Sequence, residues 1–220
     1  LFLLFFSVNF NVPSVPAKEL DTLNWVKTTN SKIENNFFID PFYIISFNYL
    51  NIKLFKIMQK NVEKMTINYS PNFNSIKRSK NKIKYLIFHY TGMRSDRLAI
   101  NKLVNQNSKV SSHYYINRKG KLIQLVPDLY VAWHAGKSNW KKDKLLNQNS
   151  IGIEISNPGH DHGYINFNKK QIKSLIKISI ILIKKYKIKK QNILGHSDIA
   201  PLRKKDPGER FPWKFLSKNK

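Results

Sequence analysis

The chain of 220 residues contains no cysteine, which excludes disulfide bonds, thiolate zinc sites and a cysteine nucleophile. Acidic residues are scarce, because the chain has 13 Asp and Glu but 39 Lys and Arg. Only six of these basic residues are arginine. The metalloprotease motif HExxH is also missing. The lack of cysteine does not decide the compartment, because a secreted protein need not contain disulfides.

The excess of basic residues gives a formal net charge of +26. A charge of this size suits an anionic partner, such as nucleic acid, an anionic membrane surface or a cell-wall polymer. The simpler interpretation is that most of these lysines are solvated surface residues. The sequence has no helix-turn-helix, RRM or zinc-finger pattern, so we do not expect nucleic acid as a partner.

The first 57 residues differ in composition from the rest, since they hold nine of the 14 phenylalanines but only five lysines. Three interpretations remain open. The segment is a signal peptide, with residues 1–6 as its apolar region and Val15-Pro16-Ala17 as a cleavage site. It is an appended segment that packs on the domain or a membrane. Or it is a leader upstream of a natural start at Met58 or Met65, which we favour because the chain begins with leucine.

These interpretations set the expected domain limits and compartment. We expect an N-terminal extension at residues 1–64 and a single folded domain, a monomer, at residues 65–220. A start at Met58 or Met65 predicts a cytoplasmic protein, and a signal peptide predicts a periplasmic one. No transmembrane segment is expected, because the N-terminal apolar run is shorter than the roughly 20 residues that a spanning helix needs.

Hydrophobic patterns predict alternating strands and helices from residue 83 onward. Ser95 is expected to cap a helix that ends at about Val104, and Asn168 to cap a helix at Lys169–Tyr186. The apolar residues of the second helix recur at three- and four-residue spacing, namely Ile172, Leu175, Ile176, Ile180 and Ile183. The predicted strands are Ile83–Phe88, Ser112–Asn117, Leu122–Val126, Ile151–Ile155 and Ile193–Leu194, and Pro127–Lys142 is a predicted loop. The order β-α-β-β-β-α-β predicts an α/β (α+β) domain whose central mixed sheet is flanked by helices.

Two histidines follow directly after predicted buried strands. These are His89 and His196, and the ends of such strands deliver side chains into clefts. Asp206 lies ten residues after His196, in a loop rich in proline and glycine. Two imidazoles and one carboxylate leave the fourth position of a tetrahedral zinc ion open, as in a catalytic site. Spacing alone does not force the three residues together.

A zinc hydrolase also needs a base and a group that stabilises the developing oxyanion. Glu154 is the acid within the predicted strand Ile151–Ile155, and burial there would raise its pKa toward that of a general base near neutral pH. The alternative is an edge strand with Glu154 facing water. Lys204 lies two residues before Asp206, on the same face of an extended loop, although it is one lysine among many.

Five motifs carry a resemblance to a known family. They are Phe88–Thr91 (FHYT), Ser111–Tyr114 (SSHY), Trp133–Gly136 (WHAG), Ser150–Glu154 (SIGIE) and Gly195–Gly208 (GHSDIAPLRKKDPG), the last followed by Phe211–Trp213 (FPW). In this order they resemble the zinc-dependent N-acetylmuramoyl-L-alanine amidases, the family shared with peptidoglycan recognition proteins and phage amidases. The final motif is similar to the AmpD/AmiD branch, closer to AmiD. The resemblance covers residues 83–213.

The resemblance implies an amidase-like fold with one catalytic Zn²⁺ on His89, His196 and Asp206. It implies Glu154 as general base and Lys204 as oxyanion stabiliser. The implied reaction hydrolyses the amide between the lactyl group of N-acetylmuramic acid and L-alanine of the stem peptide, in peptidoglycan turnover or recycling. Phage enzymes and recognition proteins commonly carry a tyrosine where this chain has Ser112, so the branch that uses a glutamate is favoured.

Three further residues are candidates for binding a peptidoglycan or muropeptide substrate, namely Trp133, His134 and Arg203. Each has a structural alternative: a packed loop aromatic, a loop histidine and a structural cation. The rival interpretation of the whole domain is a non-catalytic peptidoglycan-binding module.

Overall fold

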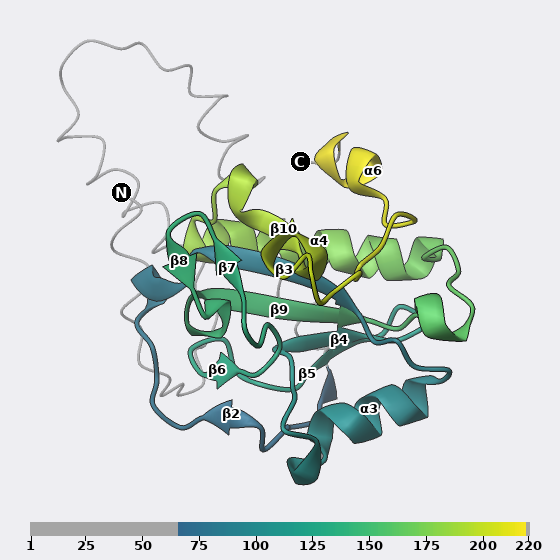
Figure 1. Ribbon diagram of the computed structural model, residues 1–220, viewed down its shortest axis with the longest axis horizontal. Helices are drawn as coiled ribbons and strands as arrows, with labels where there is room; N and C mark the ends of the chain where they lie inside the picture. The colour runs from purple at the N-terminus through teal and green to yellow at the C-terminus, as the bar shows by residue number, and fades with distance from the viewer. Residues whose placement is uncertain (1–65, 219–220) are drawn as a thin grey trace, which may run out of the picture. The chain divides into compact units, whose positions relative to one another are not determined.

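The strands predicted from apolar runs assemble into one central sheet (Figure 1). The computed structural model describes residues 66–218, so the interpretations of residues 1–57 lie outside the described residues. The strands are β1 (Thr66–Ile67), β2 (Phe73–Asn74), β3 (Tyr85–Tyr90), β4 (Tyr114–Ile116), β5 (Leu122–Gln124), β6 (Val131–Ala132), β7 (Asn139–Trp140), β8 (Asp143–Lys144), β9 (Ser150–Ile155) and β10 (Ile193–Gly195). The α-helices are α3 (Asp96–Val104), α4 (Lys169–Tyr186), α5 (His196–Ile199) and α6 (Trp213–Lys218).

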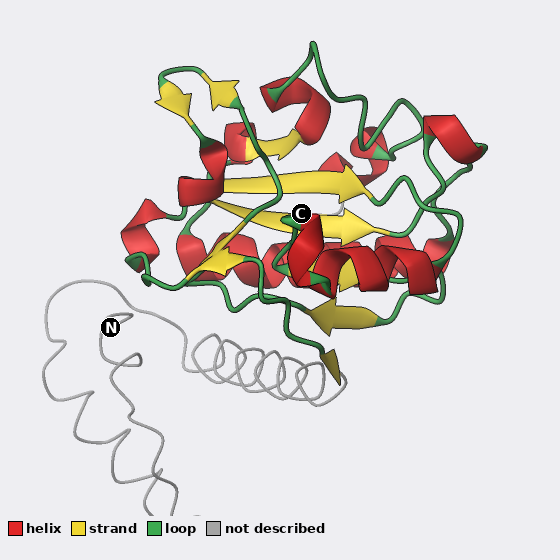
Figure 2. Cartoon of the chain, turned by 60° about the horizontal axis from the view of Figure 1, so that its bottom comes forward, coloured by secondary structure: helices red, strands yellow, loops and turns green. Residues whose placement is uncertain are grey.

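The central sheet is mixed, as predicted. Its strands follow the order β1-β5-β4-β9-β3-β10. The neighbours β4, β9, β3 and β10 run parallel, whereas β5 runs antiparallel to β4 and β1 parallel to β5. Figure 2 shows the strands with helices on both sides, which confirms the α/β (α+β) class with a central mixed sheet.

Alternation along the strands gives the sheet two different faces. Phe88 on β3 and Ile153 on β9 point to the face covered by α4, where they join its buried residues in the main core cluster. Their neighbours His89 and Glu154 therefore point to the opposite face. The face toward α4 therefore packs in the apolar core, and the opposite face carries the polar candidates His89 and Glu154.

Helix α4 has the predicted bounds and cap, and the apolar residues that mark it in the sequence lie on or beside its buried face. Asn168 and Gln171 form a capping box, with the Asn168 side chain accepting from the backbone N–H of Gln171. The buried apolar positions are Ile172, Leu175, Ile178, Leu182 and Tyr186. The predicted residues Ile176, Ile180 and Ile183 are half-buried, because an isoleucine-rich helix offers two adjoining apolar stripes and the sheet covers only one.

The opposite face is covered by α3 and by loops. Ser95 caps α3 as predicted, because its side chain accepts from the backbone N–H of Leu98. Ala99 and Leu103 of α3 pack with Tyr115 in a separate buried cluster. The predicted loop 127–142 is more ordered than expected, since β6 pairs with β2 and β7 pairs with β8.

The residues before β3 are tied closely to the domain. Asn72 Nδ2 donates to the carbonyl oxygens of Asn105 and Val110, both at 2.8 Å. Arg78 is buried and donates to the carbonyl oxygens of Asp128 and Asn147, at 2.8 and 3.0 Å. No helix within residues 66–218 is long and apolar enough to cross a membrane.

Candidate active site

The parallel strands bring the candidate residues to one edge of the sheet. His89 on β3 stands in register with Glu154 on β9, which in turn stands in register with Tyr115 on β4. His196 follows directly after β10, whose last residue, Gly195, pairs with Phe88. Because the carboxyl ends of parallel neighbours meet at the same edge, His89 and His196 become neighbours although 107 positions separate them.

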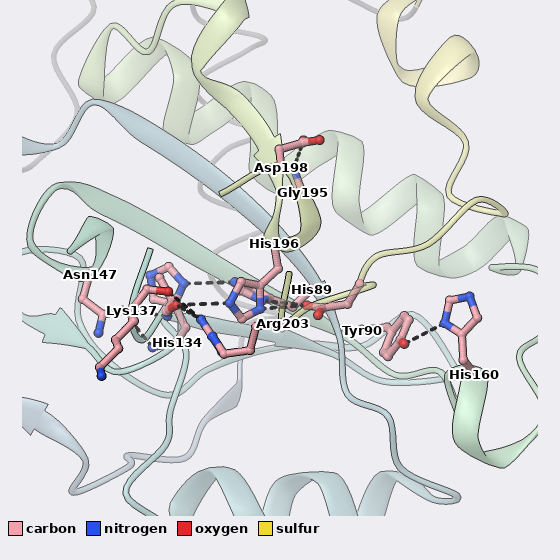
Figure 3. Close-up of polar contacts among 12 residues, drawn as sticks. His89, Tyr90, His134, Lys137, Asn147, His160, Gly195, His196, Asp198 and Arg203 are labelled. Carbon is pink, nitrogen blue, oxygen red and sulfur yellow. Dashed lines mark hydrogen bonds and ion pairs between the residues drawn. The ribbon is translucent and has the colours of Figure 1, made fainter. Parts of the chain in front are cut away.

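The structure brings the three candidate metal ligands together. The Nδ1 atoms of His89 and His196, whose rings lie side by side in Figure 3, are 3.0 Å apart. Each lies 3.0 Å from Asp206 Oδ2. All three residues are buried, and among residues 66–218 they are the group of His and acidic side chains placed to hold a metal ion. The backbone N–H of Ser197 donates to the Asp206 carbonyl oxygen at 2.8 Å, which holds the loop against α5.

The surroundings set the charges of this group. Burial, followed by the neighbouring His196, lowers the pKa of His89 to about 4, so its imidazole is neutral near pH 7. Burial alone would raise the pKa of Asp206, but the adjoining imidazoles of His196 and His89 hold that pKa well below its usual range. A neutral imidazole beside an ionised carboxylate is a donor set that divalent zinc favours.

The geometry also fits a metal. Atoms that lie about 2.0–2.1 Å from a tetrahedral zinc ion are about 3.3 Å from one another, close to the 3.0 Å separations found here. Two imidazole nitrogens and one carboxylate oxygen fill three positions and leave a fourth for a reacting group. The described residues therefore contain a His-His-Asp group able to hold a catalytic metal ion.

Glu154 lies on an inner strand, between β3 and β4, which excludes the edge-strand alternative. Its Oε2 is buried and, within residues 66–218, has no hydrogen-bond partner. Burial, followed by the charge of Asp206, raises the pKa of Glu154 well above its usual value, while Lys204 and Lys102 lower it. A buried, unpartnered carboxyl with a raised pKa is suited to taking up and releasing a proton.

A cavity of about 430 Å³ connects these groups. Its lining includes Glu154, His196, Asp206 and Lys204, which places the candidate base and the candidate oxyanion stabiliser beside the metal group. Lys102 of α3 is also part of the lining. Sequence patterns gave no signal for Lys102, because it differs from the other lysines only in its place across the cavity.

The three candidate substrate residues also line the cavity, but two of them are engaged elsewhere. Trp133 Nε1 donates to Asn74 Oδ1 at 2.7 Å. Arg203 donates to the carbonyl oxygens of Ala135 and Lys137, at 2.9 and 2.8 Å. The indole face and the remaining guanidinium nitrogens can still meet a ligand, so their assignment to substrate stays a prediction.

His134 is buried with only 8% of its surface exposed, and both ring nitrogens have partners in the protein. Its Nδ1 lies 3.0 Å from His89 Nε2, and its Nε2 lies 3.1 Å from Ser150 Oγ. Asn147 Oδ1 accepts from the backbone N–H groups of His134 and Ala135. Asn147 could not be singled out from the sequence because no motif includes it, and Ser150 stood out only as the start of a strand motif.

Comparison with known proteins gives a consistent result. The sequence model of the N-acetylmuramoyl-L-alanine amidase family matches residues 79–209. The chain is 39% identical to the N-acetylmuramoyl-L-alanine amidase AmiD of Escherichia coli over 148 residues, which are 62% of this chain and 52% of AmiD. It is 40% identical to the 1,6-anhydro-N-acetylmuramyl-L-alanine amidase AmpD of Haemophilus influenzae over 111 residues, 50% of this chain and 58% of AmpD. The chain thus spans little more than half the length of these curated relatives.

Solved structures agree. The E. coli AmiD structure, a complex with the substrate anhydro-N-acetylmuramic acid-L-Ala-D-gamma-Glu-L-Lys, matches with a TM-score of 0.59 and 36% identity, over 66% of this chain and 60% of that one. An AmpD crystal structure matches with a TM-score of 0.62 and 27% identity, over 71% of this chain and 94% of that one. With the motifs, the sheet and the His-His-Asp group in place, the chain belongs to the N-acetylmuramoyl-L-alanine amidase family.

Proposed function

We propose that this protein is a zinc-dependent N-acetylmuramoyl-L-alanine amidase. It hydrolyses the amide between the lactyl group of N-acetylmuramic acid and L-alanine of the stem peptide, in peptidoglycan turnover or recycling. The observation that carries the proposal is the convergence of His89, His196 and Asp206 beside a cavity lined by His196, Asp206 and Glu154. We assign the activity to a catalytic domain at residues 65–220 and treat residues 1–64 as an N-terminal extension.

His89 and His196 through Nδ1, and Asp206 through Oδ2, would hold the zinc ion. Bound there, zinc supplies Lewis-acid polarisation of the scissile carbonyl. The protein supplies three ligand atoms, and the fourth position would be open to the cavity. Because His89 is 1% exposed and His196 3% exposed, substrate would reach this point from the side of the cavity.

Glu154 acts as the general base. Its raised pKa lets the carboxylate accept a proton from the attacking water and return that proton to the leaving amine of L-alanine. Its buried Oε2 has no competing partner within the described residues, so the carboxylate is free to face the reacting atoms.

Lys204 stabilises the negative charge that develops on the carbonyl oxygen. It lines the same cavity as Glu154 and Asp206, and its charge acts on both Glu154 and His89. A fixed cation at a site shielded from water stabilises a developing oxyanion more strongly than it would in bulk solvent.

The cavity wall also suits an anionic substrate. Lys102, Lys204 and Lys205 together with Arg203 line it, and their positive charges attract the carboxylates of a stem peptide. Trp133 offers an aromatic surface at the same wall. Among the similar structures, the AmiD complex contains a muramyl tripeptide, which supports a muropeptide as the substrate class.

The test is whether the full chain releases stem peptide from a purified muropeptide, with the products detected by mass spectrometry. We expect cleavage that EDTA abolishes and zinc restores. Glu154→Gln should slow turnover by about 10²–10⁴-fold, because the proton transfer loses its base. His162→Leu, which alters an exposed histidine outside the cavity lining, serves as the matched control and should cleave normally.

The opposite result has a definite meaning. A protein that binds zinc and muropeptide but never cleaves would make the amidase proposal wrong, and a non-catalytic peptidoglycan-binding module would replace it.

A further inference from the structure

One dipeptide, His134-Ala135, contacts both candidate histidine ligands from behind. His134 Nδ1 lies 3.0 Å from His89 Nε2, and the Ala135 carbonyl oxygen lies 3.2 Å from His196 Nε2. In both rings the contacted nitrogen is Nε2, whereas Nδ1 lies beside Asp206. Figure 3 shows the contact between His134 and His89 as a dashed line.

The direction of each hydrogen bond follows from counting protons. Ser150 Oγ donates its single proton to the Leu146 carbonyl oxygen at 2.5 Å. It can then only accept from His134, so the proton of the His134 ring is on Nε2, 3.1 Å away. His134 Nδ1 is therefore an acceptor, and His89 Nε2 must be the donor at 3.0 Å. This series of hydrogen bonds leaves Nδ1 of His89 without a proton and with its lone pair toward Asp206.

The same reasoning applies to His196. A carbonyl oxygen can only accept, so His196 Nε2 carries the proton that it donates to Ala135. Its Nδ1 is then also a bare lone pair. Both imidazoles are thus held in the tautomer that a metal ion requires at Nδ1.

Two features show that this support is built into the fold. Asn147 Oδ1 accepts from the backbone N–H groups of His134 and Ala135, at 3.0 and 2.7 Å, and fixes the dipeptide. Gly152 on β9 leaves the space that the His134 ring fills, because a Cβ there would lie 2.5 Å from the ring atoms Cγ and Nδ1. The ring therefore packs directly on the backbone of the strand that carries Glu154.

We propose that His134 is a positioning residue, which acts through His89 rather than on the substrate. Together with Ser150 and the Ala135 carbonyl it fixes the tautomer and orientation of both metal-binding imidazoles. The inference rests on the zinc site of the proposed function, and it gives His134 a different role from the substrate contact that the motif suggested. Losing such an outer partner typically weakens metal affinity by about 10–100-fold.

The experiment measures zinc affinity of the full chain by competition with a chromophoric chelator. His134→Leu removes the acceptor for His89 and should weaken zinc binding by about 10–100-fold. His134→Asn places an amide oxygen close to the position of Nδ1, and we expect it to recover most of the affinity. Ser150→Ala releases the His134 tautomer and should cause a smaller loss. His162→Leu, the same change at an exposed position, should bind zinc like wild type.

A spectroscopic readout separates positioning from mere stability. With cobalt in place of zinc, His134→Leu should change the visible absorption of the bound ion, whereas His134→Asn should keep the wild-type spectrum. If His134→Leu proves unfolded by circular dichroism, the His134→Asn and Ser150→Ala variants decide the matter on their own.

The outcomes also distinguish the two proposals. Zinc affinity of His134→Leu within twofold of wild type, or no recovery in His134→Asn, overturns the positioning role alone. A wild-type chain that binds no zinc overturns the proposed site itself. Binding without turnover leaves the positioning role standing and rejects the amidase.

Discussion

Replacing Gly152 with alanine puts a methyl group where the His134 ring now lies. The added Cβ would sit 2.5 Å from ring atoms Cγ and Nδ1 and 2.8 Å from Cδ2. To reach an ordinary contact of about 3.5 Å the ring must withdraw by about 1 Å. A shift of that size would disturb the 3.0 Å contact between His134 Nδ1 and His89 Nε2. We expect a loss of zinc affinity without any change to a metal ligand.

Two magnitudes follow for Gly152→Ala. Overpacking a buried strand costs about 1–3 kcal/mol of unfolding free energy in the metal-free protein. Saturating zinc adds to the unfolding free energy, and a 10–100-fold weaker affinity reduces this added stability by about 1.4–2.7 kcal/mol. Denaturant titrations with and without zinc give both quantities, because the difference between the two curves reports only the metal.

A double-mutant cycle provides the control. In a His134→Ala background the ring is gone, so the methyl of alanine at position 152 meets open space and should cost little. The two substitutions should therefore be strongly coupled. Strictly additive costs, or a zinc-dependent stabilisation in Gly152→Ala equal to that of wild type, would refute the reasoning.

Three further outcomes are expected. The raised pKa of Glu154 means that the folded state binds an extra proton, so the stability of the metal-free protein falls as pH rises from the unfolded to the folded pKa of this group. Glu154→Gln should abolish this fall, and denaturant titrations at a series of pH values measure it. Lys204→Met should move the acid limb of the pH profile of kcat/KM to higher pH, since Lys204 lowers the pKa of Glu154; an unmoved limb would contradict their coupling. Leu175→Ala, at a core position that is 0% exposed, should cost about 2–5 kcal/mol of unfolding free energy, read from urea titration, and a cost under 1 kcal/mol would show a looser core.

Much of the site was predictable because strand ends are visible in the sequence. The apolar runs before His89 and His196 marked two buried strands, and parallel pairing of β3 with β10 places their ends together. Glu154 was visible in the same way, as an acid within an apolar run. The bounds of α3 and α4 followed from their capping residues, Ser95 and Asn168, which act locally and need no tertiary information.

The support behind the ligands was not predictable, because it depends on contacts between distant segments. Nothing in the sequence indicates that Asn147 binds the backbone of His134, or that Gly152 leaves room for an imidazole. The exact residues of α4 that become fully buried also depend on tertiary contacts. The isoleucines of this helix make two stripes of similar hydrophobicity, and only the position of the sheet decides which stripe is buried.

The residues that precede β3 extend the folding unit beyond the segment that the family match covers. That match begins at residue 79, one position after Arg78. A protease that cut there would separate β1 and β2 from the rest of the domain. The same cut would detach the side-chain amide of Asn72 and the guanidinium of Arg78, each of which donates to two backbone carbonyl oxygens of the domain. The remaining chain would keep every candidate catalytic residue and still lose part of the scaffold around Asn147. Limited proteolysis of the segment 66–78 should therefore report whether the site is intact, because an intact site requires this segment to stay bound and protected.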